Sequence, residues 1–152
     1  MEQVVFNNQT ADGQKVLILR GASGAGKSTF ASKQKGYHIT LEADQFFMKD
    51  GKYNFDFTKL KDAHEDCFKR FVKALNEGKN VIVANTNTKF WEMERYVKEC
   101  IKRDIGFKII TLNGKFKNEH GVPEDKVQQM RDRMDSSEEI NRQIEKIEKS
   151  MS

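Results

Sequence analysis

The sequence predicts an α/β fold, in which a small and mainly parallel sheet carries helices on both faces. Three observations lead to this prediction: four short apolar runs, segments of helical periodicity between them, and a glycine-rich loop directly after the first run. Alternating strand and helix patterns of this kind are typical of doubly wound sheets with right-handed crossovers. Because such sheets bind ligands at the carboxyl ends of their strands, we expect the functional residues to follow the strands.

The four expected strands are short, rich in β-branched residues and uninterrupted, as expected for strands covered on both faces of a parallel sheet. In chain order they are KVLIL at 15–19, HITL at 38–41, VIVA at 81–84 and FKIITL at 107–112. The sheet should therefore be small, and both of its faces should be buried.

Helical patterns fill the segments between and after these strands. Residues 58–77 place an apolar stripe on one face and stop before Gly78, and residues 89–104 repeat the pattern with Thr88 as the expected N-cap. Pro123 suits the first turn of a further helix, whose apolar stripe is Val127, Met130 and Met134.

A charged helix is expected at about 136–150, where the spacing of Ser136 and Glu139 matches a capping box. Its apolar stripe is thin, consisting of Ile140, Ile144 and Ile147. We expect a surface helix, and a contact with a partner or a clip across the domain are the alternatives.

Composition indicates one soluble globular domain over residues 1–152. The chain is 37% hydrophobic and 33% charged, and its 27 basic and 23 acidic residues leave a net charge of +4, which permits an anionic partner but mostly reflects a solvated surface. No stretch approaches 18 apolar residues and the N-terminus does not resemble a leader, so we expect a cytoplasmic protein without a membrane span. Cys67 and Cys100 fall in expected helices and are expected to be buried free thiols. The oligomeric state stays open.

The segment GASGAGKSTF at 21–30 matches the phosphate-binding pattern G-x-x-x-x-G-K-[ST]. In this pattern backbone N–H groups surround phosphate oxygens, Lys27 reaches the β- and γ-phosphates, and the Ser28 hydroxyl ligates Mg²⁺. We therefore expect ATP and Mg²⁺ as cofactors. The expected ATP-binding residues are Gly21, Ser23, Gly24, Ala25, Gly26, Lys27, Ser28 and Thr29.

Asp44 follows the second expected strand and is the candidate general base, because a carboxylate near the phosphate loop can accept the proton of an incoming hydroxyl. It can also contact the metal, directly or through a water. The alternative role is an N-cap of a short helix.

Asn85 and Asn87 follow the third expected strand and are candidates for holding substrate or a Mg²⁺-bound water; capping of the next helix is the alternative. Trp91 is a further candidate substrate contact. The aromatic residues after Asp44 are candidates for stacking on nucleobases or for core packing, namely Phe46, Phe47, Tyr53, Phe55 and Phe57. His64 is expected to be a packed histidine.

A basic segment with Lys115, Lys117 and His120 follows the last expected strand. Such a segment can close over the triphosphate, where Lys117 would stabilise charge on the transferring group as a catalytic cation. The alternative is an ordinary charged connection.

The motifs together resemble the P-loop kinase domains related to bacteriophage polynucleotide 5′-hydroxyl kinase, including the polynucleotide-kinase-like AAA-type ATP-binding domains. The resemblance covers about residues 15–135 and is carried by LILRGASGAGKST, LEADQFFMKDGKYNFD, AHEDCFKR, NVIVANTNTKFWEMERY and KNEHGVPEDKVQQM. It implies a three-layer P-loop NTPase fold with a short basic lid. It also implies transfer of the γ-phosphoryl group of Mg²⁺-ATP to a hydroxyl, with Asp44 as the base.

Three positions depart from the pattern of this family. Phe47 stands where the viral kinase has an arginine, and Lys117 stands where its lid has arginines. Ala84 replaces the aspartate of the strand-end motif D-N-T-N-T. The sequence favours a 5′-hydroxyl kinase acting on a nucleic acid end; a small-metabolite or nucleoside kinase and a nucleotide-binding interaction module with little turnover are the alternatives.

Overall fold

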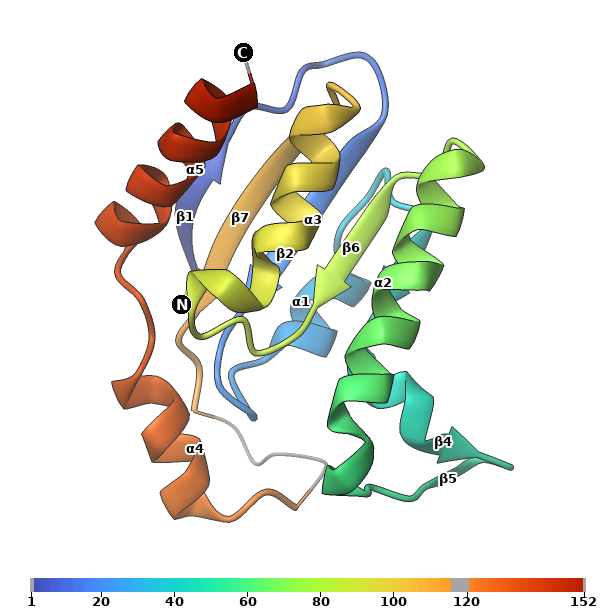
Figure 1. Ribbon diagram of the computed structural model, residues 1–152. Coiled ribbons are helices and arrows are strands. Elements are labelled where there is room, and N and C mark those ends of the chain that lie inside the picture. Colours follow the sequence, from blue (N-terminus) through green and yellow to red (C-terminus); the bar gives the residue numbers. More distant parts are fainter. Residues whose placement is uncertain (1, 116–120, 152) are drawn as a thin grey trace.

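The computed structural model describes residues 2–115 and 121–151 (Figure 1). In chain order the elements are β1 (Glu2–Asn7), β2 (Lys15–Arg20), α1 (Lys27–Ser32), β3 (Ile39–Leu41), η1 (Ala43–Phe47), β4 (Met48–Lys49), β5 (Lys52–Tyr53), η2 (Phe57–Lys59), α2 (Leu60–Asn76), β6 (Val81–Ala84), α3 (Phe90–Lys102), β7 (Gly106–Leu112), α4 (Glu124–Asp132) and α5 (Ser137–Met151). The short helices η1 and η2 are of the 3₁₀ type.

A five-stranded sheet with the order β1-β7-β2-β6-β3 forms the centre of the molecule. The four strands expected from the sequence, β2, β3, β6 and β7, pair in parallel, whereas β1 pairs antiparallel with β7. The mainly parallel sheet is therefore confirmed. The strand β1 and the separate hairpin β4–β5 were not expected, because β1 is a mostly exposed edge strand without a continuous apolar run.

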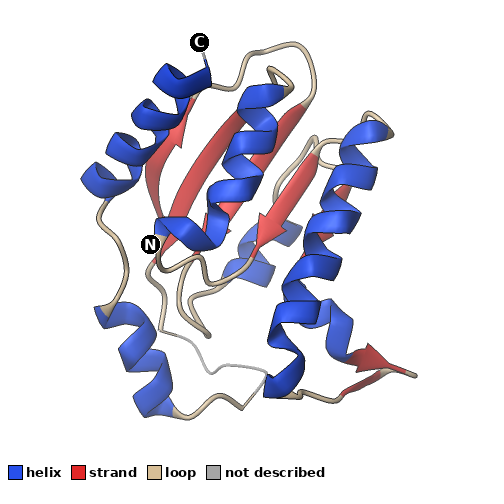
Figure 2. Ribbon diagram, in the orientation of Figure 1, coloured by secondary structure: helices blue, strands red, loops and turns tan. Residues whose placement is uncertain are grey.

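Helices cover both faces of the sheet, with α2, α3 and α5 on one face and α1 on the other (Figures 1 and 2). Side chains of β2 alternate between the two faces: Val16 and Ile18 belong to the core under α2, α3 and α5, and Leu17 and Leu19 to the core under α1. The strand β6 is buried on both faces in the same way, and this two-sided burial explains the apolar runs of the central strands.

The first turn of α3 is capped by a residue distant in the sequence. The helix begins at Phe90, so Thr88 is not its N-cap as expected. Asp135 accepts a hydrogen bond from the Phe90 N–H at 2.8 Å, and Glu92 accepts one from the Lys89 N–H at 3.0 Å. The segment between α4 and α5 therefore supplies the cap, a tertiary contact that local sequence rules do not reveal.

The helix α5 crosses the face of the sheet at β1 and packs against α3. Its three isoleucines, Ile140, Ile144 and Ile147, belong to the larger core, and Asn141 donates from its side chain to the Val5 carbonyl at 2.8 Å. Of the interpretations that the sequence left open, the clip across the domain is the one that the structure shows.

The carboxyl ends of the parallel strands lie at the lower end of the molecule, together with α4 and the β4–β5 hairpin (Figure 1). Cys67 and Cys100 are buried free thiols, as expected. Within residues 2–115 and 121–151, no helix has the length and apolar character that crossing a bilayer requires.

Candidate functional site

The glycine-rich loop joins β2 to α1 and depends on two positions where a side chain is not tolerated. A Cβ atom on Gly21 would lie 2.8 Å from the Leu112 carbonyl oxygen and 2.9 Å from the Ala25 Cβ. Gly26 is the N-cap of α1 and has a φ of 95°, in the left-handed region that favours glycine. The loop backbone therefore packs against the end of β7 and leads directly into the N-terminus of α1. Such a loop followed by a helix N-terminus is suited to binding a phosphate group.

Lys27 is the first residue of α1, and its ammonium group turns back over the loop. It donates hydrogen bonds to the carbonyl oxygens of Gly21 at 2.7 Å and Ala22 at 3.1 Å. Burial lowers the pKa of Lys27 to about 8, while the nearby carboxylates of Glu42 and Asp44 act in the opposite direction. The lysine is therefore a cation at neutral pH, held where the loop would meet phosphate.

Ser28 and Glu42 bring together oxygen donors of the kind that Mg²⁺ binds. The Ser28 hydroxyl donates to the Glu42 carboxylate at 3.4 Å, across the gap between α1 and the end of β3. In the described part of the chain no three His, Cys, Asp or Glu side chains form a metal-binding group. Mg²⁺ at a nucleotide site needs only one or two protein oxygens in addition to phosphates, so this pair fits the ion. Sequence reasoning did not single out Glu42.

Asp44 lies in η1, close enough to Lys27 to influence its pKa. The Tyr53 hydroxyl donates to the Asp44 Oδ1 atom at 3.3 Å, and burial together with this carboxylate raises the pKa of Tyr53 to about 12. The N-cap of η1 is Glu42, not Asp44, so the capping role considered for Asp44 is not what the structure shows.

Two residues from other elements hold the backbone around Asp44. The Asn85 side chain, at the end of β6, accepts a hydrogen bond from the Ala43 N–H at 2.8 Å. Arg70 of α2 donates to the Glu42 carbonyl at 3.0 Å and to the Gln45 side chain. Asn85 is 8% exposed and therefore acts in the structure as a support for η1; a contact with substrate stays a prediction.

Asn87 and Trp91 differ sharply in exposure. The Asn87 side chain donates to the Leu19 carbonyl at 2.9 Å, and the residue is 1% exposed with a φ of 47°. The Asn87 amide therefore supports the end of β2 in the structure, and a contact with substrate stays a prediction. Trp91, in the first turn of α3, is 70% exposed and can be reached by a substrate.

Comparison with known proteins identifies the family. The model of an AAA domain family, AAA_33, matches residues 16–147, which include the phosphate loop, Asp44 and the ends of β6 and β7. The chain belongs to this AAA domain family. The expected resemblance to P-loop kinase domains of the polynucleotide kinase type is confirmed.

This chain spans only a small part of the length of two relatives of this AAA domain. NEDD4-binding protein 2 of Homo sapiens is 32% identical over 143 residues, which cover 86% of this chain and 8% of that protein. A candidate bifunctional polynucleotide kinase/RNA ligase of Autographa californica nuclear polyhedrosis virus is 31% identical over 109 residues, covering 62% of this chain and 15% of that protein. In the solved Pnkp1/Rnl/Hen1 complex, one chain aligns with a TM-score of 0.49 and 22% identity over 80% of this chain and 40% of its own length.

A pocket of about 360 Å³ lies on the β7 side of the phosphate loop in this AAA domain. Ala22 and Ala25 of the loop and Arg131 of α4 line it, and the Ser23 hydroxyl donates to the Met130 sulfur at 3.9 Å. The helix α4 therefore covers this side of the loop. Lys117 and His120 lie outside the described residues, so the catalytic role of Lys117 and the basic lid stay predictions. Arg131 is a cation at this pocket that sequence reasoning missed.

Two of the residues that depart from the family pattern, Phe47 and Ala84, are buried in the cores of the protein. Phe47 is 5% exposed and belongs to the larger core, so its position holds an apolar ring in place of the viral arginine. Ala84 is 2% exposed and packs in the core under α1. With an alanine there, Glu42 is the carboxylate that the structure places at Ser28.

Arg20 joins the ends of three strands beneath the phosphate loop. Its guanidinium donates to the carbonyls of Asn87 at 3.0 Å and Thr88 at 2.9 Å and to the Thr111 hydroxyl at 3.2 Å. The residue is 1% exposed, and burial lowers its pKa to about 10, against the opposing influence of Asp135 and Glu92. It therefore stays charged at neutral pH. Nothing in the local sequence distinguished Arg20 from a surface arginine.

Substitution Arg20→Met should lower the free energy of unfolding by about 3–5 kcal/mol, because it leaves buried carbonyls and nearby carboxylates without their cation. Urea denaturation monitored by circular dichroism measures this change. The matched control is Arg133→Met, whose side chain is 49% exposed and lies 3.8 Å from Glu92, and whose loss should cost less than about 1 kcal/mol. Equal effects of the two substitutions would contradict the role assigned to Arg20.

Proposed function

We propose that this AAA domain transfers the γ-phosphoryl group of Mg²⁺-ATP to the 5′-hydroxyl of a polynucleotide. The observation that carries the proposal is the place of the Asp44 carboxylate, which lies near the ammonium group of Lys27 and accepts a hydrogen bond from Tyr53. A general base for an incoming hydroxyl is required at this place, beside the outer phosphates. The membership in the AAA domain family and the viral relative support the same reaction class.

In the proposed reaction Asp44 accepts the proton of the acceptor hydroxyl as that oxygen forms a bond to the γ-phosphorus. The bond between this phosphorus and the bridging oxygen breaks, and ADP leaves. Lys27 stabilises the negative charge on the phosphate oxygens, together with the N–H groups at the start of α1. Mg²⁺, held by Ser28 and Glu42, would neutralise charge on the β- and γ-phosphates.

The order of the strands supports separate binding places for ATP, the phosphoryl donor, and for the hydroxyl substrate that accepts the phosphoryl group. The strands β7 and β3 lie on opposite sides of β2, from which the phosphate loop starts. The 360 Å³ pocket is on the β7 side, and Asp44 follows β3 on the other side. We assign the nucleoside of ATP to the pocket and the acceptor to the side of Asp44, so that the two meet at the γ-phosphate.

Incubation with γ-labelled ATP and a panel of acceptors tests the proposal. We expect label on single-stranded DNA or RNA with a 5′-hydroxyl end and none on the same oligonucleotide with a 5′-phosphate, which has no free acceptor. Transfer only to nucleosides or to members of a metabolite panel would contradict the polynucleotide substrate and favour a small-substrate kinase. Tight ATP binding without transfer to any acceptor would favour an interaction module.

A further inference from the structure

Beyond Asp44 the surface has an open groove with aromatic walls, which we call the aromatic groove. Its volume is about 520 Å³, within the range of about 300–1,000 Å³ that ligand pockets span. The groove is built by the chain between β3 and α2, which includes η1, the β4–β5 hairpin and η2. Its lining residues are Phe46, Phe47, Lys49, Asn54, Phe55, Asp56, Phe57 and Lys59.

A series of ring contacts connects the aromatic groove to the candidate base. Tyr53, whose hydroxyl contacts Asp44, stacks on Phe55 with ring centroids 6.3 Å apart and planes at 17°. Phe55 in turn contacts Phe47, whose ring centroid is 5.2 Å away, and Phe47 contacts Phe46 at 5.4 Å. The groove therefore starts one side chain away from the proposed reaction centre.

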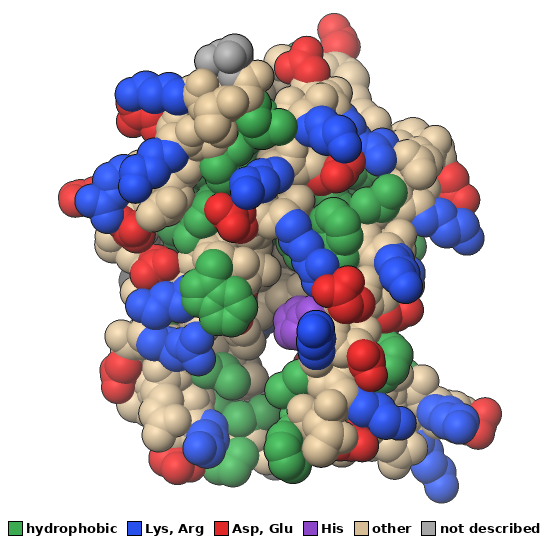
Figure 3. Space-filling view, viewed as in Figure 1, with side chains coloured by type: hydrophobic (Ala, Val, Ile, Leu, Met, Phe, Trp, Pro, Cys, Tyr) green, Lys and Arg blue, Asp and Glu red, His purple; other side chains and the backbone are tan. Residues whose placement is uncertain are grey.

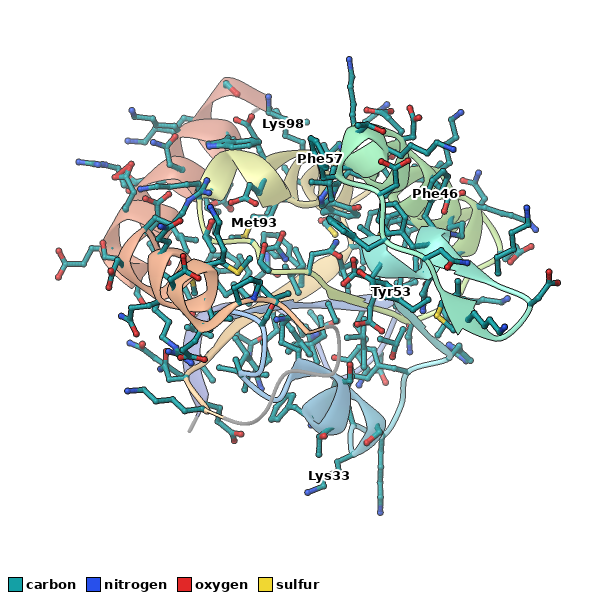
Figure 4. The ribbon with its side chains drawn as sticks, turned by 90° about the horizontal axis from the view of Figure 1, so that it is seen from below. Lys33, Phe46, Tyr53, Phe57, Met93 and Lys98 are labelled. Carbon is teal, nitrogen blue, oxygen red and sulfur yellow. The ribbon has the colours of Figure 1, made fainter. Side chains whose placement is uncertain are left out.

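Three of the aromatic residues are exposed to solvent. Phe57 is 73% exposed, Phe55 is 52% exposed and Phe46 is 38% exposed. Their neighbour Phe47 is only 5% exposed and belongs to the core. Figure 4 shows Phe46, Tyr53 and Phe57 on the α2 side of the molecule, and Figure 3 shows hydrophobic side chains exposed among charged ones at the lower end of this face. Clustered apolar exposure of this kind marks a binding surface, since core packing does not require it.

Cations accompany the exposed rings. Lys49 and Lys59 line the aromatic groove from opposite ends of the segment, one in β4 and the other in η2. The carboxylate of Asp56 also lines the groove, where it caps η2 by accepting hydrogen bonds from the Thr58 N–H at 3.0 Å and the Thr58 hydroxyl at 2.6 Å, so the two lysines exceed the acidic lining by one charge. Flat rings for stacking and lysines for phosphates are the combination by which proteins bind single-stranded nucleic acid without reading its sequence.

We propose that the aromatic groove binds the nucleotides next to the 5′ end of a single-stranded nucleic acid, so that the terminal hydroxyl reaches Asp44. This inference rests on the proposed function, because it assigns the path of the same acceptor. Phe55 and Phe57 stack on bases, and Lys49 and Lys59 contact the phosphates between them. Binding should be independent of base sequence, since rings and lysines do not distinguish base edges.

Substitution Phe57→Ala tests the stacking directly. The ring is 73% exposed, so its removal should leave the fold and the affinity for ATP unchanged. Fluorescence anisotropy with a labelled single-stranded oligonucleotide should show affinity about 5- to 100-fold weaker. The matched control is Met151→Ala, an exposed apolar residue at the end of α5, which should bind like the unmodified protein. Unchanged oligonucleotide affinity in Phe57→Ala would overturn the proposal.

The double substitution Lys49→Gln, Lys59→Gln tests the phosphate contacts. For single strands the logarithm of affinity falls with the logarithm of salt by about 0.7 for each phosphate neutralised, so the slope should become shallower by about 1.4. An unchanged salt dependence of the affinity would show that Lys49 and Lys59 do not contact the phosphates. Failure of the unmodified protein to bind any single strand at low salt would overturn the whole assignment and leave the groove for a protein partner.

Activity separates this inference from the proposed function. If the unmodified protein phosphorylates oligonucleotides and Phe57→Ala does so with the same KM, the aromatic groove is refuted while the kinase reaction stands. If the protein binds oligonucleotides through Phe57 but transfers no phosphate to them, the groove stands and the proposed reaction is refuted. A nucleoside 3′-phosphate, too short to enter the groove, should react with the same kcat/KM in both proteins.

Discussion

Substitution Asp44→Asn should reduce turnover by about 10²–10⁴-fold and leave ATP affinity nearly unchanged. Asparagine keeps the size of the side chain and can still accept the hydrogen bond from Tyr53, which is 3.3 Å long in the structure. It cannot take a proton from the acceptor hydroxyl. The N-cap of η1 is Glu42, so this change does not remove a helix cap, and stability should be preserved.

Single-turnover transfer from γ-labelled ATP measures the loss, and calorimetry measures ATP binding in the same protein. The control is Asp50→Asn, an exposed residue in the neighbouring hairpin, which should react at the rate of the unmodified protein. Full activity in a folded Asp44→Asn protein would exclude Asp44 as the general base. A lowered melting temperature with normal activity would show a purely structural role.

Substitution Lys27→Ala should weaken Mg²⁺-ATP binding by about 10- to 150-fold, which is the range for losing hydrogen bonds from a charged group. In the structure this ammonium group contacts carbonyls of Gly21 and Ala22 and belongs to the loop, not to either core. The fold should therefore survive. Titration calorimetry decides, with Lys33→Ala as the control, because Lys33 follows α1 and points away from the loop (Figure 4).

The pH dependence of binding gives a second measurement on Lys27. Burial lowers its pKa to about 8 in the protein without nucleotide, and bound phosphates favour the charged form, so the complex holds the proton to higher pH. As pH rises through 8 the free protein loses this proton, and ATP affinity should fall by up to about tenfold for each further pH unit. Proton uptake above pH 8 should accompany binding in the unmodified protein. It should be lost in Lys27→Ala, and an equal pH dependence in both proteins would assign the effect to another group.

The sheet and the phosphate loop could be predicted from the sequence because their signals are local. The strands β2, β6 and β7 are buried on both faces, and such burial requires apolar runs that are visible without any partner, whereas the edge strand β3 is only partly buried and was visible as a short apolar run before a polar segment. The edge strand β1 lacks this signal, because only part of it is buried and its pairing with β7 comes from the other end of the chain. The isoleucine stripe of α5 was visible, but its burial against α3 and β1 was one alternative among three.

The functional site likewise contains residues that local sequence signals revealed and residues that only tertiary contacts revealed. The sequence alone determined the phosphate loop with Gly21, Gly26 and Lys27, since consecutive residues build this motif, and it placed Asp44 at a strand end. Only the tertiary structure decided that Glu42 meets Ser28, that Asn85 and Arg70 hold η1, and that Arg20 is buried beneath the loop. These contacts join residues 14 to 91 positions apart. The hydrogen bonds that distinguish a supporting side chain from a solvated one form only when the fold brings the strand ends together.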